Sequence, residues 1–377
     1  MTLTILVALL IAIAIPIGVM IFIYKLDFYK TGQFIIMLVC FGAGGLAYGL
    51  AAFINPLSLR GGLANYNQMI QFVAPVVEEI LKGIAIWILV RRPKFNYFVD
   101  GAIYGFTAGI GFAVLENIEY VMGHPSAALA VAINRVISTN LMHAAATATL
   151  GIIIGIARFR KTTPRILLSL GGLVTAMILH MGFNNLVTRV NSGWLLLYAI
   201  IIGAGASALI VVMIRRGLEE ERTWIGETLN QEMRVEREEA AAVQNLDNVD
   251  HVIQHLAERL GEDKAEQIRK LLYIQARLGI KTKGAEMMED ANLRTAILTE
   301  IASLRKEMEA ARKQIGSYAM MYLRATHLEE SFSWQDLLAH RIEEASQQTH
   351  PAGPSIFDRL GDRLASPDTN PTHHSGG

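Results

Sequence analysis

Seven apolar stretches fill most of the first 214 residues, and each is about long enough to cross a lipid bilayer as a helix. A membrane-spanning helix needs about 20 apolar residues, because the chain rises about 1.5 Å per residue across a hydrocarbon core about 30 Å thick. The stretches cover residues 2–24, 34–54, 69–90, 99–122, 126–157, 165–188 and 193–214. The pattern predicts an all-α fold: a polytopic membrane helical bundle of about seven transmembrane helices.

Charged residues are divided unequally between the two halves of the chain. Residues 1–214 contain 13 Lys and Arg and 6 Asp and Glu, whereas residues 215–377 contain 21 and 28. This distribution excludes a wholly soluble enzyme, and nucleic acid is a poor partner because the only acid-poor half lies in lipid. A single cysteine, Cys40, allows no intramolecular disulfide and no cysteine-rich metal site.

The apolar and polar halves predict three regions. We expect a transmembrane catalytic domain at residues 1–216, a cytoplasmic α-helical region at 217–348 and a disordered tail at 349–377, where Pro, Ser, Gly, Asp and Thr prevail. The helical region has no catalytic constellation. It is either an interaction or regulatory module with a cytoplasmic partner, or a solvated helical bundle without a regulatory role.

Basic residues alternate from loop to loop and predict the orientation. Eleven follow the odd-numbered stretches and two follow the even-numbered ones, so the positive-inside rule places the N-terminus outside and the C-terminus in the cytoplasm of an integral membrane protein. The eleven are Lys25, Lys30, Arg91, Arg92, Lys94, Arg158, Arg160, Lys161, Arg165, Arg215 and Arg216, and the two are Arg60 and Arg189.

Ionisable residues inside the apolar stretches are the candidates for chemistry, because each costs at least about 2.5 kcal/mol near the bilayer centre. They are Glu78, Glu79 and Lys82 in the third stretch, Glu116 in the fourth beside Asn117, Arg135 and His143 in the fifth, and His180 in the sixth with Asn184 one turn later. At the helical rise, Glu78, Glu116, His143 and His180 lie about 9–15 Å from the outer ends of their helices. We therefore expect these four side chains to share one layer.

Helical spacing suggests contacts within this set. Glu78 and Lys82 are one turn apart and can form an ion pair, whereas Glu78 and Glu79 point about 100° apart. Structural roles are also open for these residues. The cluster could be a buried ion pair that only holds two helices together. His143 could be a packing residue, and Arg135 could be an anchor at the outer headgroups. Gly101, Gly105 and Gly109 form a ridge of small residues, which indicates close packing of a neighbouring helix.

Carboxylates and imidazoles supply a general base, a general acid and oxyanion donors, which together can activate water against an amide. They are also possible ligands for a divalent metal such as zinc. The residues alone leave two classes of function open, intramembrane hydrolysis and ion or proton transport, because buried Glu and His side chains serve both. A non-catalytic membrane signalling protein is a further alternative.

Four motifs on separate helices resemble the PrsW family of membrane-embedded proteases. They are EEILK at Glu78–Lys82, FVDGAIYGFTAGIGFAVLENIEY at Phe98–Tyr120, Arg135 with His143, and HMGFN at His180–Asn184. The resemblance covers about residues 35–215. It implies a hydrolase of a bacterial cytoplasmic membrane that cuts a single-span protein such as an anti-sigma factor, within the superfamily of CAAX-type prenyl-protein proteases and abortive-infection proteins.

The resemblance also implies site residues. Glu78 is similar to the glutamate that activates water, with Glu79 beside it, and His180 and Asn184 resemble the motif that stabilises the oxyanion. Glu116 stands where the prenyl-protease branch has histidine, which argues against a prenyl-protein protease. The catalytic set is therefore Glu78, Glu79, Glu116, His143, His180 and Asn184, supported by Lys82, Asn117 and Arg135. If a metal is present, Glu78, Glu116, His143 and His180 are its expected ligands; otherwise no cofactor is expected.

Overall fold

Helices make up all the regular secondary structure in the described residues of the computed structural model, as the sequence predicts. The structure describes residues 2–329 apart from residues 28, 30–33, 190–191, 233–234, 236, 245 and 247–248. The apolar half contains α1 (Leu3–Lys25), α2 (Phe34–Arg60), α3 (Tyr66–Gln68), the π-helical turn η1 (Met69–Val73), α4 (Ala74–Leu89), α5 (Phe98–Gly123), the 3₁₀ turn η2 (Pro125–Ala127), α6 (Ala128–Ile137), α7 (Thr139–Ala157) and α8 (Thr162–Val187). The fold class predicted from the sequence is confirmed.

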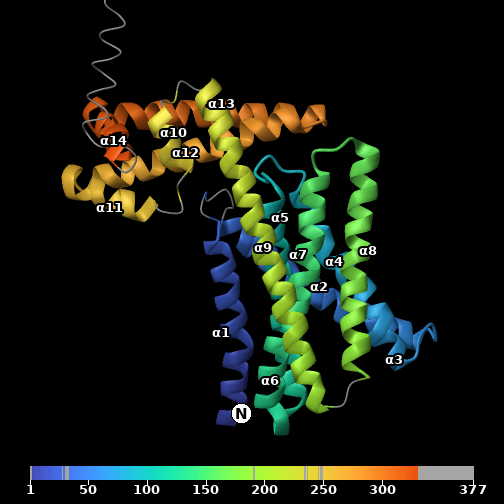
Figure 1. Ribbon diagram of the computed structural model, residues 1–377. Coiled ribbons are helices and arrows are strands. Elements are labelled where there is room, and N and C mark those ends of the chain that lie inside the picture. Colours follow the sequence, from blue (N-terminus) through green and yellow to red (C-terminus); the bar gives the residue numbers. More distant parts are fainter. Residues whose placement is uncertain are drawn as a thin grey trace, which may run out of the picture. The chain divides into compact units, whose positions relative to one another are not determined.

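The polar half continues directly from the last apolar stretch. Helix α9 (Ser192–Glu232) contains both the seventh apolar stretch and the first charged one, without a break between them. It is followed by α10 (Arg237–Gln244), α11 (Val249–Leu260), α12 (Glu262–Met287), α13 (Ala291–Ile315) and α14 (Ser317–Glu329), all labelled in Figure 1. The expected domain boundary at residues 216 and 217 falls inside α9 and stays a prediction, and the expected disordered tail at 349–377 lies outside the described residues.

Five helical segments among the described residues are long and apolar enough to cross a membrane: Leu3–Lys25, Phe34–Arg60, Phe98–Gly123, Pro125–Ala157 and Thr162–Val187. The expected third span differs from a simple helix, because η1 interrupts the chain before the 16-residue helix α4. A π-helical turn adds a residue to one turn of the helix, and such turns are frequent at functional sites. Here the turn directly precedes the helix that carries Glu78 and Glu79.

Helix α5 is the central helix of the apolar half. Its most apolar window is 94% buried, against 22% for α1 and α8, and it packs against α1, α2, α4, α6, α7 and α9 (Figure 1). The ridge of Gly101, Gly105 and Gly109 makes this contact possible, because a Cβ atom at Gly101 would lie 2.1 Å from the carbonyl oxygen of Gly151 on α7. Close packing of the glycine ridge is thus confirmed, and it holds the α7 backbone directly against the helix that carries Glu116.

Helices of the polar half contact the loops at one end of the apolar helices. The Lys281 ammonium on α12 donates to the Pro93 carbonyl oxygen over 2.7 Å, and Arg165 on α8 pairs with Asp290 just before α13 at 3.0 Å. Met1–Leu323 form one compact unit. The loop between α4 and α5 is therefore tied to both halves of this unit.

Candidate active site

Glu79 occupies the centre of a buried polar cluster between α4, α7 and α8. Its Oε1 atom accepts hydrogen bonds from the Lys82 ammonium and from His180 Nδ1, the latter over 2.9 Å, and its Oε2 atom accepts from the Thr147 hydroxyl over 3.3 Å. Glu79 and Lys82 are both fully buried. The expectation that Lys82 pairs with Glu78 is wrong, since the ion pair forms with Glu79 at spacing i,i+3 rather than i,i+4.

Glu116 forms a second centre on α5. Its Oε2 atom lies 2.8 Å from His143 Nε2 and 2.7 Å from Arg135 Nη2. Arg135 Nε also donates to the Asn117 side chain over 2.9 Å, and Asn117 donates to Asn140 over 3.0 Å. Arg135 therefore contacts Glu116 and Asn117, and its interpretation as an anchor at the outer headgroups stays a prediction. The fifth apolar stretch is divided at Ser138 into α6 and α7, and Arg135, in the last turn of α6, joins the cluster.

The hydrogen bonds fix which imidazole nitrogens carry protons. An ionised carboxylate only accepts hydrogen bonds, so His180 donates through Nδ1 to Glu79 and His143 donates through Nε2 to Glu116. In the neutral rings, His180 Nε2 and His143 Nδ1 then keep their lone pairs. The Lys82 ammonium lies 3.1 Å from His143 Nδ1, which suits a donor facing a lone pair.

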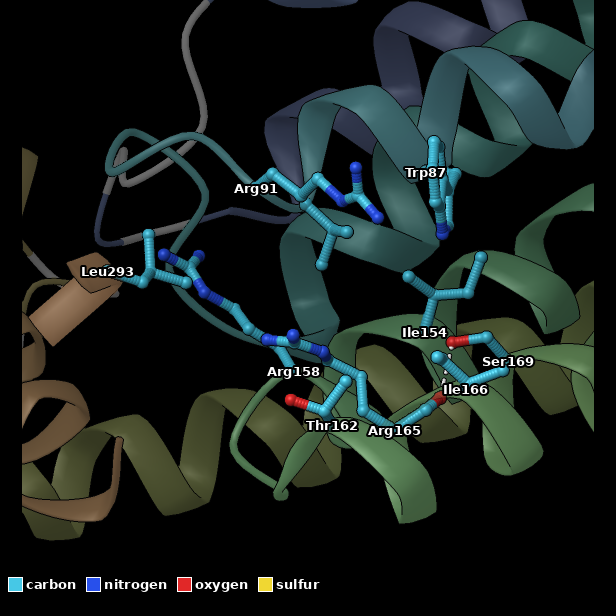
Figure 2. A pocket seen from close by; sticks show the side chains of 10 residues that line it. Trp87, Arg91, Ile154, Arg158, Thr162, Arg165, Ile166, Ser169 and Leu293 are labelled. Atoms are coloured by element: carbon cyan, nitrogen blue, oxygen red, sulfur yellow. Dashed lines mark hydrogen bonds between the residues drawn. The ribbon is translucent and has the colours of Figure 1, made fainter. Parts of the chain in front are cut away.

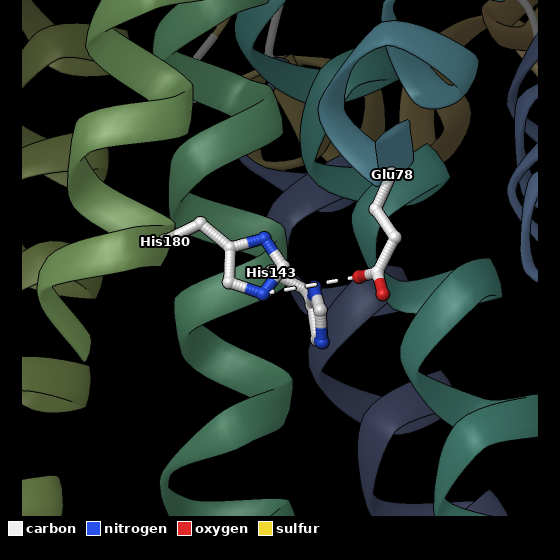
Figure 3. A group of neighbouring side chains, drawn as sticks. All are labelled: Glu78, His143 and His180. Carbon is white, nitrogen blue, oxygen red and sulfur yellow. Dashed lines mark ion pairs between the residues drawn. The ribbon is translucent and has the colours of Figure 1, made fainter. Parts of the chain in front are cut away.

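Glu78 is the third acid, and one of its oxygens has no partner. Its Oε1 atom accepts a hydrogen bond from the Asn55 amide over 3.3 Å, whereas Oε2 is buried without a hydrogen-bond partner among the described residues. That free oxygen lies 3.8 Å from His180 Nε2, and Figure 3 shows both histidines facing Glu78. The unpaired lone pairs of Glu78 and His180 therefore point at one another across a gap.

Charge counting distinguishes Glu78 from the other two acids. Glu79 pairs with Lys82 and Glu116 pairs with Arg135, so Glu78 is left without a cation of its own. Burying an uncompensated carboxylate is costly. Glu78 is therefore the position in this cluster that gains most from a proton or from a bound cation.

The residues also fit a metal ion. Glu78, His143 and His180 each offer one ligand atom, and these atoms lie within 4.8 Å of one another. Two imidazoles and one carboxylate are a common protein ligand set for catalytic zinc. The carboxylates of Glu79 and Glu116 orient the two rings from behind, as second partners of metal-binding histidines do. Glu116, an expected ligand, is engaged with Arg135 instead, and a metal at His143 Nδ1 requires the Lys82 ammonium to move away.

Asn184 lies one turn beyond His180, but its side-chain contact is different from the expected one. Its amide donates to the carbonyl oxygen of Ile70 in η1 over 2.9 Å. The π-helical turn leaves backbone carbonyls open to side chains, and Asn185 donates to Gln71 in the same turn. Asn184 therefore joins α8 to the entrance of α4 through this bond.

Two polar residues that contact Glu78 or Glu79 are absent from the sequence-based set. Asn55 lies one residue past the expected second span, where it looks like a loop residue, although α2 continues to Arg60. Thr147 lies one helical turn after His143, on the same face of α7, so the spacing i,i+4 was a usable signal. Both contribute directly to the partners of Glu78 and Glu79.

Comparison with known proteins identifies the family. A sequence model described as PrsW family intramembrane metalloprotease matches residues 32–214. The curated protein "Protease PrsW" of Bacillus subtilis (strain 168) is 27% identical over 185 residues, which cover 48% of this chain and 83% of the relative. No solved structure matches the chain. Residues 32–214, which contain the whole cluster around Glu78, belong to the PrsW family of intramembrane proteases, and the chain is therefore a membrane-embedded hydrolase.

Proposed function

We propose that the chain hydrolyses a peptide bond of a single-span membrane protein, such as an anti-sigma factor, with a water activated by Glu78. The observation that carries the proposal is the buried, unpartnered Oε2 atom of Glu78 opposite His180 Nε2. A general base needs a free lone pair within reach of the water. Glu79 and Glu116 are engaged with cations and histidines, which leaves Glu78 for this role.

The hydrogen-bond pattern supports a sequence of proton movements. A water held between Glu78 Oε2 and His180 Nε2 loses a proton to Glu78 as its oxygen attacks the peptide carbonyl carbon. The protonated Glu78 then gives that proton to the leaving amine when the carbon–nitrogen bond breaks. Glu79 holds His180 in the orientation that this requires, through the bond to Nδ1.

The oxyanion needs a donor that the described contacts do not already occupy. In the neutral form, His180 Nε2 carries no proton, so His180 donates to an oxyanion only when protonated. Lys82 is a better candidate, because an ammonium has three protons and its two hydrogen bonds go to Glu79 and His143. Removing one oxyanion donor costs about 3–4 kcal/mol of transition-state stabilisation in soluble enzymes.

Glu78, His143 and His180 are the residues that would hold a metal, for which we propose zinc on the basis of the ligand set. With a metal bound, Glu78 would be a ligand and not the general base. Bound there, zinc lowers the pKa of a coordinated water to about 7 and polarises the carbonyl. Glu79 and Glu116 would then fix the ring orientations of the two histidines. Metal content can be measured by elemental analysis of the purified protein and its His180→Ala variant.

The decisive experiment compares Glu78→Gln with a matched substitution, Glu119→Gln. Glu119 lies on the same helix as Glu116, but it bonds to Tyr48 and not to the cluster. The full chain is reconstituted in liposomes with a single-span substrate, and the cleavage rate is measured. Glu78→Gln should lower the rate by about 10²–10⁴-fold, the usual contribution of a general base, while Glu119→Gln should leave it unchanged.

Two outcomes would contradict the proposal. Cleavage by Glu78→Gln at the unmodified rate would remove Glu78 from the chemistry. Absence of cleavage of any single-span substrate by the unmodified chain, together with proton or ion flux that depends on Glu78, would favour the transport alternative.

A further inference from the structure

A cavity lies in the groove between α4, α7 and α8, and its lining contains none of the residues of the polar cluster. It has a volume of about 360 Å³, within the range of roughly 300–1,000 Å³ that ligand pockets occupy. Its walls are apolar, with residues from all three helices. They include Ile84 and Trp87 of α4, Leu150 and Ile154 of α7, and Ile166 and Leu170 of α8.

The groove ends in a smaller pocket that is basic. This pocket, of about 80 Å³, is lined by Arg91, Arg158 and Arg165 together with Trp87 and Thr162 (Figure 2). Arg91 lies just after the end of α4, Arg158 just after the end of α7, and Arg165 in the first turn of α8. They therefore meet at the end of the bundle where the sequence concentrates its basic residues.

Arg158 is the most unusual of the three. Its side chain is 2% exposed, and Nη2 donates to the Arg92 carbonyl oxygen over 3.1 Å. Its Nε and Nη1 atoms are buried without a hydrogen-bond partner in the described part of the chain. Buried donors of a charged group are normally satisfied, so two free donors in a pocket wall indicate a missing acceptor. Burial lowers the pKa of Arg158 to about 10, and the guanidinium is still charged at neutral pH.

The other two arginines are held in place by different contacts. The Arg91 guanidinium stacks over the Trp87 ring, 3.4 Å from its centroid. Arg165 pairs with Asp290, the only acid that contacts a lining arginine in the described ion pairs. Asp100 and Glu300 also lie close enough to Arg158 to act on it electrostatically, but neither lines the pocket. The lining itself therefore has three guanidinium groups and no carboxylate.

The basic pocket and the apolar groove are continuous. Trp87, Arg91, Ile154, Ile166 and Ser169 line both. A ligand that satisfies both parts has an anionic group at one end and a hydrocarbon chain at the other. Basic pockets between transmembrane helices at the cytoplasmic side are known to bind anionic lipid headgroups, and tryptophan is enriched at that depth.

We propose that this continuous site binds one anionic phospholipid, with its phosphate at Arg91, Arg158 and Arg165 and an acyl chain in the groove between α4 and α8. The charge of the pocket and the apolar lining of the groove match the two ends of such a lipid. A transmembrane helix of a substrate is a poorer match, because a helix with its side chains is about 10–12 Å across. Free phosphate would use only the basic end.

The site would connect the lipid to the polar cluster through two helices. Helix α4 carries Trp87 in the groove and Glu78 and Glu79 in the cluster, and α8 carries Arg165 and His180. Lipid binding is nevertheless independent of hydrolysis, and it can be measured without a substrate.

The experiment titrates detergent-purified full chain with dioleoylphosphatidylglycerol or dioleoylphosphatidylcholine and counts bound lipids by native mass spectrometry. The unmodified chain should retain one phosphatidylglycerol, in preference to phosphatidylcholine. Arg91→Gln and Arg158→Gln should each weaken this binding about five- to tenfold, the loss of one basic contact to an anionic lipid. Ser169→Leu should weaken it without a change of charge, because the larger side chain enters the groove.

The control is Arg160→Gln, in the loop between α7 and α8 but exposed and absent from both linings. It should bind phosphatidylglycerol as the unmodified chain does, and thermal unfolding of every variant shows whether it is folded. If Arg158→Gln does not fold, Arg91→Gln and Ser169→Leu still decide the result.

Four results would overturn the proposal. Equal binding of the two lipids, or equal weakening by Arg160→Gln, would reduce the effect to surface charge. Unchanged binding by Ser169→Leu, with displacement by millimolar inorganic phosphate, would indicate a phosphate site without a lipid chain. Displacement of phosphatidylglycerol by a single-span peptide would assign the groove to the substrate.

Discussion

Substitution of Gly109 by alanine should damage the proposed site from behind, without touching a catalytic side chain. A Cβ atom at Gly109 would lie 2.5 Å from the carbonyl oxygen of His143 and 2.6 Å from Ala144 Cα. Ordinary contacts of a Cβ atom begin at 3.4 Å, so the backbones of α5 and α7 must separate by about 0.9 Å. The displaced residue is His143, whose Nε2 atom binds Glu116.

Two magnitudes follow from this displacement. Overpacking in a tight core costs about 1–3 kcal/mol of unfolding free energy. A misplacement of about 1 Å in a catalytic group can lower the rate about 10²-fold. We therefore expect Gly109→Ala to remain folded at reduced thermal stability and to lose one to two orders of magnitude in kcat for a single-span substrate.

The matched control is Gly101→Ala, on the same face of α5. Its Cβ atom would lie 2.1 Å from the Gly151 carbonyl oxygen, about 12 Å along the helix from Gly109. It should lose as much stability as Gly109→Ala and less kcat. Gly182→Ala, with no atom within 4 Å of the new Cβ, should change neither. The kcat of each variant is measured per folded molecule in liposomes. Equal kcat in the Gly101 and Gly109 variants would refute the link between the Gly109 contact and the position of His143.

Three further predictions concern other parts of the chain. Lys82→Met should lower the unfolding free energy by about 3–5 kcal/mol, because it leaves the fully buried Glu79 without its cation. Thermal unfolding tests this, with the exposed Lys161→Met as the control. Equal stability of the two variants would contradict the prediction. Burial and nearby acids, Asp27 among them, raise the pKa of Glu221 well above 4.5. The folded state therefore holds a proton that the unfolded state releases, so the free energy of unfolding falls as the pH rises above about 4.5. Glu221→Gln should remove the contribution of Glu221 to the loss of stability between pH 5 and 8. An unchanged dependence of stability on pH in this variant would contradict the prediction. A C-terminal reporter that is active only outside the cell should be inactive, since the basic loops predict a cytoplasmic C-terminus; strong activity would reverse the topology.

The helices and the members of the polar cluster could be predicted from the sequence, but the pairing inside the cluster could not. Apolar length and the cost of burying charge single out Glu78, Glu79, Glu116, His143 and His180. The sequence does not show whether Lys82 pairs with Glu78 or with Glu79, because the spacings i,i+3 and i,i+4 both allow an ion pair. It is decided by His180 and Thr147, which approach Glu79 from other helices.

Helix interruptions were the other limit. The sequence shows a continuous apolar stretch over residues 126–157, yet the chain breaks at Ser138 and brings Arg135 to Glu116. The π-helical turn before α4 is equally invisible to hydropathy, although it accepts the Asn184 amide. Such breaks depend on which side chains from neighbouring helices satisfy the freed backbone groups, and a single sequence pattern does not contain that information.

Helix α9 sets a rule for building chimaeras of this protein. It runs unbroken for 41 residues, about 60 Å at the helical rise and about twice the hydrocarbon thickness. Gly217 lies against Phe98, and Gly279 of α12 lies against Ile225 of α9, so both the rotation and the height of the helix are fixed at two levels. One residue inserted between these contacts turns everything beyond it by about 100° and lifts it by about 1.5 Å. A foreign soluble module should therefore be joined after Glu232, where α9 ends, and not at the membrane surface.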